Sequence, residues 1–444
     1  MSDRISLLES LIARARKLGA EHADAVVFDS VSSSVSFRLG KLEEVDRSES
    51  YDLGLRVFIG KRQAAVASND MSTHALEQLA ERAVAMARTT PEDPFCGLAP
   101  SDQLARSFKD LDLEDKVEPS SEKLVELARS CEGAALGTAG ITNSEGAGAG
   151  WGCGAVALVT SDGFAGAYAT TSVSVSVSVI AGEGTGMERD YEFSSARHLA
   201  DLGDPQEVGR NAASMALKRL NARRVKSQSV PVVFDPRTAN SMLGHFAGAI
   251  NGISIARGTS FLKDKMGQKI FKPGVRIVDD PHMVRGVRSR PFDGEGVKNA
   301  QMNLVEDGVL QTWLLDSSAA RQLKLRSTGH AARGTGGPPS PSTTNLYLVP
   351  GTLSPRELMA DIKQGFYITE LIGMGVNGVT GDYSRGAAGF WIENGELTFP
   401  VNEVTIAGNL NAMFAEMTAA NDLIFRYGTN APTLRIEGMT IAGD

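Results

Sequence analysis

The chain has 444 residues, more than one hydrophobic core usually holds, so we expect two or three packed domains. Its 45 Lys and Arg against 53 Asp and Glu give a formal charge of −8, which argues against direct binding to nucleic acid or an anionic membrane. Three widely spaced cysteines encode neither a zinc ribbon nor a disulfide framework. No apolar run reaches the roughly 20 residues of a membrane span, and we expect a cytoplasmic protein.

The N-terminal region predicts a helix, antiparallel strands and a second helix. The expected elements are a helix over 5–18, strands over 35–39 and 51–59, and a helix over 73–88, each from the spacing of its apolar residues. Two prolines follow and end the pattern. We assign residues 1–90 to an N-terminal α+β domain and the stretch 91–119, rich in proline and acidic residues, to a linker.

The same order of elements returns after the linker, which indicates a possible duplication. Helical spacing covers 122–136, and valines alternate with serines over 172–179, as in a half-buried strand. A further helix over 205–224 closes a central α+β domain, residues 120–226. Glycines at alternate positions over 146–154 lack the lysine of a phosphate-binding loop, so we interpret them as a flexible loop.

Residues 227–444 have the texture of a β-rich C-terminal domain. Asp307-Gly308 and Asn394-Gly395 stand between apolar runs and predict hairpins. Glycines and prolines over 329–344 predict a long loop. The expected fold class is therefore α+β, with two helix–antiparallel strands–helix units followed by a β-rich domain.

Two short motifs invite functional interpretations that their context weakens. Residues 373–378 satisfy GxGxxG, but turn and strand formers follow where a dinucleotide site needs a helix. Residues 382–386 resemble a nucleophile elbow around Ser384, yet the first position is Asp382 and no helix follows. A serine hydrolase stays open only as a minor alternative.

The six histidines form no local zinc pair. They are His22, His74, His198, His245, His282 and His330. His245 lies in an apolar, small-residue helix candidate over 239–250, where a buried, hydrogen-bonded histidine is the ordinary interpretation.

This helix and several other segments give the chain a resemblance to the TldD/PmbA family, once described as modulators of DNA gyrase and now regarded as a two-subunit peptidase system. The supporting segments are GISIAR over 252–257, SFLKD over 260–264, STGH over 327–330 and TGDYSRGAAGFW over 380–391. The last block resembles the PmbA branch, also called TldE.

The resemblance locates a missing metal motif. The TldD branch carries HExxxH on the equivalent helix, whose two histidines bind zinc and whose glutamate serves as general base. Here His245 keeps the first position, but Phe246 replaces the glutamate and Ile250 replaces the second histidine. We therefore expect no catalytic residue, metal site or cofactor in this chain, and zinc in a partner subunit.

The resemblance implies a subunit that pairs with a TldD-like, metal-bearing homologue, with a homodimer possible when that partner is missing. Unfolded or modified peptides would be degraded, or trimmed of leader segments, in a shared cavity, held there as added strands. Polar residues of the glycine-rich segments are the candidate cavity lining, although turn chemistry explains them equally well. They are His245, Arg257, Thr380, Asp382, Tyr383, Ser384 and Arg385.

The competing interpretation is a non-enzymatic, peptide-binding modulator of a toxin–antitoxin or gyrase-linked process. A homologue with an intact HExxxH in the same genome would favour the peptidase complex over this alternative.

Overall fold

Two units with the order helix, three strands, helix share one sheet in the N-terminal half. The computed structural model describes residues 2–443, so the end residues 1 and 444 of the predicted domains lie outside it. The first unit comprises α1 (Ser2–Lys17), β1 (His22–Arg38), β2 (Lys41–Ile59), β3 (Arg62–Ser68) and α2 (Thr73–Thr89). The second comprises α3 (Ser121–Leu136), β4 (Ile141–Thr160), β5 (Ala165–Ala181), β6 (Glu188–Ala196) and α4 (Pro205–Lys218). Short 3₁₀ turns are η1 (Ser101–Gln103), η2 (Gly184–Gly186) and η3 (Leu199–Asp201).

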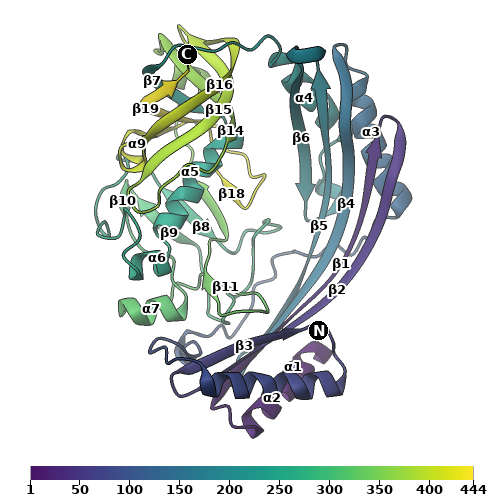
Figure 1. The fold of residues 1–444 in the computed structure, drawn as a ribbon, viewed down its shortest axis with the longest axis vertical. Coiled ribbons are helices and arrows are strands. Elements are labelled where there is room, and N and C mark those ends of the chain that lie inside the picture. The colour runs from purple at the N-terminus through teal and green to yellow at the C-terminus, as the bar shows by residue number, and fades with distance from the viewer. Residues whose placement is uncertain (1, 444) are drawn as a thin grey trace.

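The two units meet through their first strands. β1 pairs antiparallel with β4, which gives the order β3-β2-β1-β4-β5-β6 and one long, curved sheet (Figure 1). The repeated order of elements that the sequence suggested is thus present, and the sheet runs without a break between the two predicted N-terminal domains.

All four helices cover the same face of this sheet. Ala25 and Val27 of β1 pack in a core with α1 and α2, whereas Val35 and Phe37 pack in a core with α3 and α4. These positions are all odd-numbered, and alternate residues of a strand point to one face. The opposite face is left for the C-terminal domain.

The prediction of a flexible loop over 146–154 is wrong, because these residues lie within β4. Gly150 stands opposite Ser174 of β5, while the neighbouring Ala149 and Trp151 are buried. Glycine has little intrinsic preference for strands, so the alternation of glycines with buried residues was not recognised as a strand pattern. Pairing with β1 and β5 stabilises the strand.

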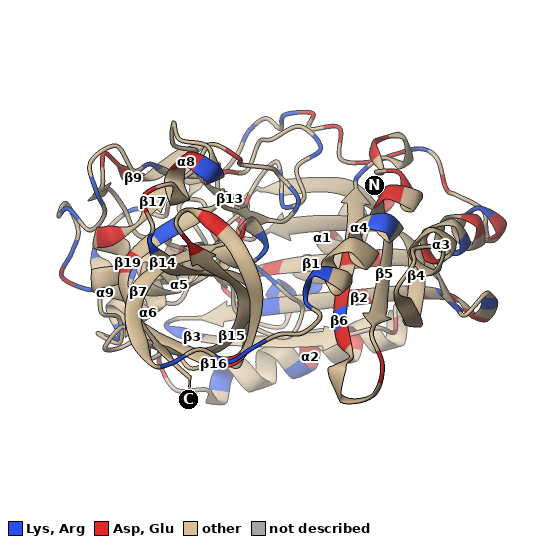
Figure 2. Ribbon diagram, turned by 90° about the horizontal axis from the view of Figure 1, so that it is seen from above, with Lys and Arg blue, Asp and Glu red and all other residues tan. Residues whose placement is uncertain are grey.

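The C-terminal domain is built around a closed ring of strands. Its helices are α5 (Pro236–Ala249), α6 (Gly252–Ala256), α7 (Ser317–Leu323), α8 (Pro355–Met359) and α9 (Leu410–Glu416). Its strands are β7 (Gln228–Phe234), β8 (Ile277–Asp280), β9 (Met302–Glu306), β10 (Val309–Leu310), β11 (Ala331–Ala332), β12 (Ser340–Pro341), β13 (Asn345–Leu348), β14 (Gln364–Ile372), β15 (Asp382–Glu393), β16 (Glu396–Asn409), β17 (Thr418–Ala419), β18 (Thr429–Asn430) and β19 (Leu434–Ala442). β16 pairs with both β15 and β19, so β16, β15, β14, β7 and β19 close into a ring (Figure 2). Helix α5 contacts this ring and also β13 and β18 of a second sheet.

Both hairpin predictions are confirmed. Asp307 and Gly308 have φ of 48° and 76° between β9 and β10, and Asn394 and Gly395 have φ of 50° and 80° between β15 and β16. Positive φ at both central residues is the signature of a type I′ turn, which matches the twist of the flanking strands.

The predicted loop over 329–344, interrupted only by β11 and β12, attaches the C-terminal domain to the sheet. Arg333 reaches Asp24 of β1, which also pairs with Arg56 of β2, and all three side chains are almost fully buried. We call Asp24, Arg56 and Arg333 the base ion cluster. Nearby, a Cβ added to Gly54 would lie 2.5 Å from the carbonyl oxygen of Thr335, so only glycine allows this approach.

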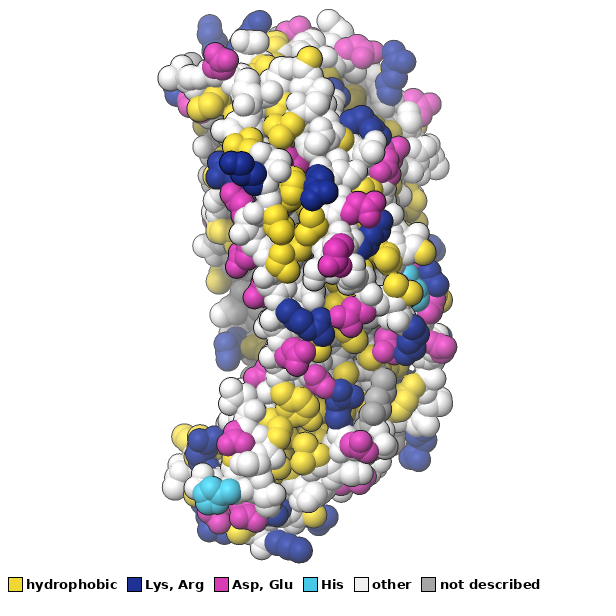
Figure 3. Space-filling view, turned by 90° about the vertical axis from the view of Figure 1, so that its right-hand side faces the viewer, with side chains coloured by type: hydrophobic (Ala, Val, Ile, Leu, Met, Phe, Trp, Pro, Cys, Tyr) yellow, Lys and Arg dark blue, Asp and Glu magenta, His cyan; other side chains and the backbone are white. Residues whose placement is uncertain are grey.

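The surface carries charges of both signs, as the net charge of −8 leads us to expect. On the face shown in Figure 3, positive and negative side chains are interspersed. None of the helices within residues 2–443 has the length and apolar character that crossing a bilayer requires.

Candidate functional site

Helix α5 separates a buried face from a polar face. Asp235 caps its N-terminus by accepting a hydrogen bond from the Arg237 amide, and Pro236 starts the first turn. Met242 and Phe246 lie on the buried face, in the core of the C-terminal domain. The opposite face carries the residues Arg237, Asn240, Ser241, Gly244, His245 and Gly248, at the spacing of one helical face.

A cavity of about 330 Å³ lies beside the second half of α5. Its lining includes His245, Phe261, Met374, Val376, Arg385 and Leu410. We call this cavity the His245 pocket. No aspartate or glutamate of the described chain lines it, so its wall carries a positive charge from Arg385 and none of the opposite sign.

His245 is held as a neutral imidazole. Burial, and then the charge of Arg385, lower the pKa of His245 below its ordinary value. Its Nε2 atom is buried and has no hydrogen-bond partner, and its ring contacts Tyr383 edge-on, with ring centroids 5.8 Å apart. The predicted hydrogen-bonded core histidine is therefore wrong: this side chain lies at the edge of the core with an unmet hydrogen-bonding atom.

Strand β15 brings Tyr383 and Arg385 toward α5. The two residues are separated by one position, so they point to the same face of the strand, and Ser384 between them is exposed on the other face. The hydroxyl of Tyr383 and the Nε of Arg385 are both buried, and neither has a partner of good hydrogen-bond geometry, although the two side chains interact with each other. Burial raises the pKa of Tyr383, which keeps its hydroxyl protonated and able to donate.

Three of the predicted cavity residues instead lie at the exposed surface around the start of β15. The Thr380 hydroxyl donates to Asp382 at 2.6 Å, and Asn409 donates to the other oxygen of Asp382 at 3.1 Å. This is turn chemistry, the alternative that the sequence left open. Ser384 points away from His245, so the structure brings no base to it and offers a serine nucleophile no support.

Arg257 is not among the residues that surround His245. It is the exposed residue that ends α6. It does not line the His245 pocket in the described structure, and its predicted role in the cavity stays a prediction.

The GxGxxG segment forms the outer wall of the pocket rather than a nucleotide loop. A Cβ on Gly375 would lie 2.0 Å from the carbonyl oxygen of Ser384, so this glycine permits close contact between the segment and β15. The next regular element is β15, a strand and not a helix. Met374, 91% exposed, and Val376 were missed as pocket residues, because their only sequence signal was apolar character inside a glycine-rich turn.

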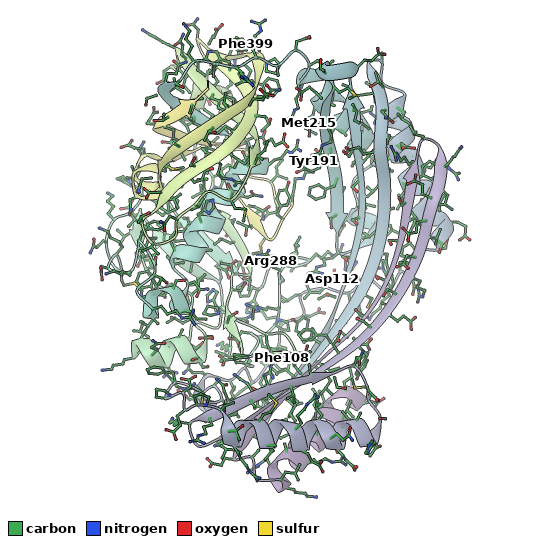
Figure 4. The ribbon with its side chains drawn as sticks, viewed as in Figure 1. Phe108, Asp112, Tyr191, Met215, Arg288 and Phe399 are labelled. Atoms are coloured by element: carbon green, nitrogen blue, oxygen red, sulfur yellow. The ribbon has the colours of Figure 1, made fainter. Side chains whose placement is uncertain are left out.

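A second recess continues along α5 toward the N-terminal half. Cavities of about 600 and 280 Å³ lie between α4, β6 and the ring of strands, and Arg385 lines both the smaller one and the His245 pocket. Figure 4 shows Tyr191 and Met215, which line these cavities, pointing from the N-terminal half toward the C-terminal domain. Arg237 and Arg219 here are paired with acids: Arg237 with Asp190 at 2.9 Å and Arg219 with Glu370 at 2.6 Å.

The side chains around His245 do not fit a catalytic zinc site. Phe246 and Ile250 are fully buried in the core, and neither has an atom that can bind a metal or accept a proton. Elsewhere in residues 2–443, no three His, Cys, Asp or Glu side chains are grouped closely enough to hold a metal ion.

Family models match three successive parts of the chain. They describe PmbA/TldA metallopeptidase domain 1 at residues 23–87, the central domain at 106–220 and the C-terminal domain at 227–443.

Relatives cover nearly the whole chain. Metalloprotease PmbA of Escherichia coli O157:H7 is 38% identical over 98% of this chain and 96% of its own length. The Haemophilus influenzae metalloprotease PmbA homolog is 37% identical over 97% and 94%. A Bacteroides thetaiotaomicron crystal structure, of a protein whose proposed role is modulation of DNA gyrase, is 26% identical with a TM-score of 0.91 over 100% of both chains. TldE from Thermococcus kodakarensis shares the fold, at 20% identity and a TM-score of 0.88 over 98% of this chain and 100% of its own.

Proposed function

This chain belongs to the PmbA/TldD family of metallopeptidases, and on that premise we propose that it is the metal-free subunit of a two-subunit metallopeptidase acting on unfolded or modified peptides. Zinc belongs to the partner, a TldD-like homologue with HExxxH on the helix equivalent to α5. This chain contributes walls, substrate positioning and assembly. The complex is cytoplasmic, in keeping with three cysteines that are all free in the described structure.

Helix α5 carries this proposal. It holds His245 against a pocket, as a metal-binding helix would, but the two further positions of the motif are Phe246 and Ile250, both with 0% exposure. A metallopeptidase needs a general base and at least two further ligands, and these side chains supply neither. A metal for the reaction therefore comes from another chain.

Exposed apolar side chains next to the pocket support an assembled state. Ile372, Met374 and Val379 are 59%, 91% and 56% exposed on one segment. Exposed apolar residues gathered on one segment are typical of a contact surface for a partner or a peptide.

Co-expression with the HExxxH homologue of the same genome tests the proposal. We expect a complex with the mass of one copy of each chain, zinc bound to the homologue, and cleavage of a carboxymethylated, unfolded protein. Replacing Met374 with Asp should weaken the complex, whereas replacing Leu325, 51% exposed and two residues beyond the end of α7, with Asp should not. Stoichiometric zinc and zinc-dependent cleavage in this chain alone would overturn the proposal.

A second candidate function rests on the role proposed for the B. thetaiotaomicron relative. A peptide-binding modulator without catalysis needs no metal-bearing partner. It is favoured if the two chains do not associate, or if the genome encodes no HExxxH homologue.

A further inference from the structure

Two buried atoms that line the His245 pocket have no hydrogen-bond partner, Nε2 of His245 and Nε of Arg385. The hydroxyl of Tyr383 lies behind the lining, and its polar neighbour is the side chain of Arg385. Tyr383 is only 2% exposed. A buried donor left unpaired costs about 1–3 kcal/mol, so such groups ordinarily have a partner in protein, water or ligand. Two of them on the wall of one cavity, beside an arginine, indicate a ligand site.

The positive charge of Arg385 indicates the charge of that ligand. An arginine side chain stays protonated in proteins, and Arg385 has no ion pair with any residue of the described chain. No acid lines the His245 pocket. The two acids of the adjoining recess that Arg385 also lines, Asp190 and Glu370, pair with Arg237 and Arg219 instead. The missing partner is therefore an anion that enters from outside.

The rest of the wall limits the kind of anion. Phe261, Met374, Val376 and Leu410 are apolar, His245 is held neutral, and Ser254 and Thr259 add two neutral hydroxyls. One guanidinium among neutral groups matches a single negative charge, whereas a phosphate group carries more negative charge than this wall balances. A cavity of about 330 Å³ lies at the lower end of the range for small-ligand sites, about 300–1,000 Å³.

We propose that the His245 pocket binds a carboxylate attached to an apolar group, with Arg385 as its ionic partner, Tyr383 and His245 as further donors, and the apolar wall around the adjacent side chain. The choice of a peptide as the carrier rests on the proposed function. The carboxylate is then either the C-terminus of a peptide or an acidic side chain within it.

Three short peptides distinguish these sources, titrated calorimetrically into the purified full chain without homologue or zinc. They are acetyl-Ala-Ala-Leu with a free carboxylate, the same peptide as its C-terminal amide, and acetyl-Ala-Glu-Leu amide. We expect one of the two carboxylate peptides to bind at least about tenfold more tightly than the neutral amide, the effect of one charged hydrogen-bonded contact. Preference for the free terminus or for the glutamate identifies the source.

Substitutions locate the binding in this pocket. Arg385→Gln should abolish the preference for a carboxylate, and Arg385→Lys should keep part of it. Tyr383→Phe, which keeps the ring, should weaken carboxylate binding several-fold. Arg356→Gln is the matched control, because Arg356 is an exposed arginine outside the pocket that pairs with Glu396. Thermal unfolding of each variant verifies that the fold is retained.

Several results would overturn the proposal. They are equal binding of acid and amide peptides by the wild-type chain, a carboxylate preference unchanged in Arg385→Gln, or binding of inorganic phosphate but of neither carboxylate peptide. Because the titration needs neither partner nor metal, its result is independent of whether the two-subunit peptidase forms. A chain that assembles and supports cleavage but shows no carboxylate preference removes this inference alone.

Discussion

The base ion cluster and the His245 pocket place buried arginines in opposite situations. At the base, Asp24 lies between Arg56 and Arg333, all buried, and the charges of the two arginines hold the pKa of Asp24 below its ordinary value against the opposing effect of burial. In the pocket, Arg385 forms no ion pair among the described residues, since the acids of the adjoining recess, Asp190 and Glu370, pair with Arg237 and Arg219. The arginines of the first arrangement have a counter-charge within the chain, and Arg385 in the second does not.

This difference separates structural arginines from a recognition arginine. A guanidinium whose carboxylate comes from the same chain contributes to holding two domains together, and its removal is felt as lost stability. A guanidinium without an internal partner adds little to stability, so its presence in a pocket calls for another explanation.

The largest expected effect comes from opening the base ion cluster. Asp24→Asn leaves two arginines buried without a counter-charge and should lower the free energy of unfolding by about 3–5 kcal/mol. Chemical denaturation measures it, with Asp112→Asn as control, because Asp112 pairs with Arg285 at the exposed surface. Equal losses in the two variants would contradict the assigned role of the cluster.

The next effect concerns the wall of the pocket. Gly375→Ala places a methyl group 2.0 Å from the Ser384 carbonyl oxygen, so the segment over 373–379 must move away from β15. We expect a loss of about 1–3 kcal/mol together with weaker carboxylate binding. Gly378→Ala is the control, since a Cβ there meets nothing within 4 Å. Unchanged binding in Gly375→Ala would separate this segment from the ligand site.

Two buried acids near the base ion cluster, Asp293 and Asp316, should make the free energy of unfolding depend on pH. Burial, and then the charge of Glu295, raise the pKa of Asp316 to about 6 and that of Asp293 to about 7. The folded chain then binds more protons than the unfolded chain between about pH 4 and 7, so stability falls as pH rises through that window. For Asp316 the loss from pH 5 to 8 should be on the order of 1 kcal/mol.

Asp316→Asn isolates this contribution. Asparagine can still accept the hydrogen bond from the Ala319 amide that caps α7, but it does not titrate. Thermal unfolding from pH 5 to 8 should therefore show a flatter profile in the variant, and a profile as steep as that of the wild type would assign the dependence to other groups.

The smallest expected effect is the loss of Arg385. Arg385→Gln should change the free energy of unfolding by less than about 0.5 kcal/mol, since no internal ion pair is broken. Chemical denaturation of Arg385→Gln and Asp24→Asn under the same conditions measures this difference in the free energy of unfolding. A loss comparable to that of Asp24→Asn would mean that Arg385 is structural after all.

Much of the fold follows from the sequence, because helices and hairpins are specified locally. Helix α2 was expected over 73–88 and spans Thr73–Thr89, and both Asn/Asp-Gly turns are where their backbone preferences put them. The long sheet was seen only in part. Residues 41–50 of β2 are exposed on both faces and show no alternation, and β4 is concealed by glycine, so pairing with distant strands decided the structure there.

The candidate site was half predictable for the same reason. His245, Tyr383 and Arg385 were selected as polar residues near glycines, and the structure brings them together. Thr380, Asp382 and Ser384 were selected by the same argument, but alternation along β15 and a hydrogen-bonded turn place them elsewhere. Which side of a strand a residue takes depends on the register of β15 with β14 and β16, and that register is a long-range property.

The contact between Arg333 and Asp24 has a consequence for biosynthesis. Asp24 and Arg56 leave the ribosome early, as does the apolar face around Val26 and Leu158, yet their partners Arg333 and Phe292 belong to the C-terminal domain. During synthesis, one face of the N-terminal sheet therefore stays exposed until the C-terminal domain has been made. A polypeptide ending before residue 292 should stick to chaperones or to itself, although every helix of that half is already present.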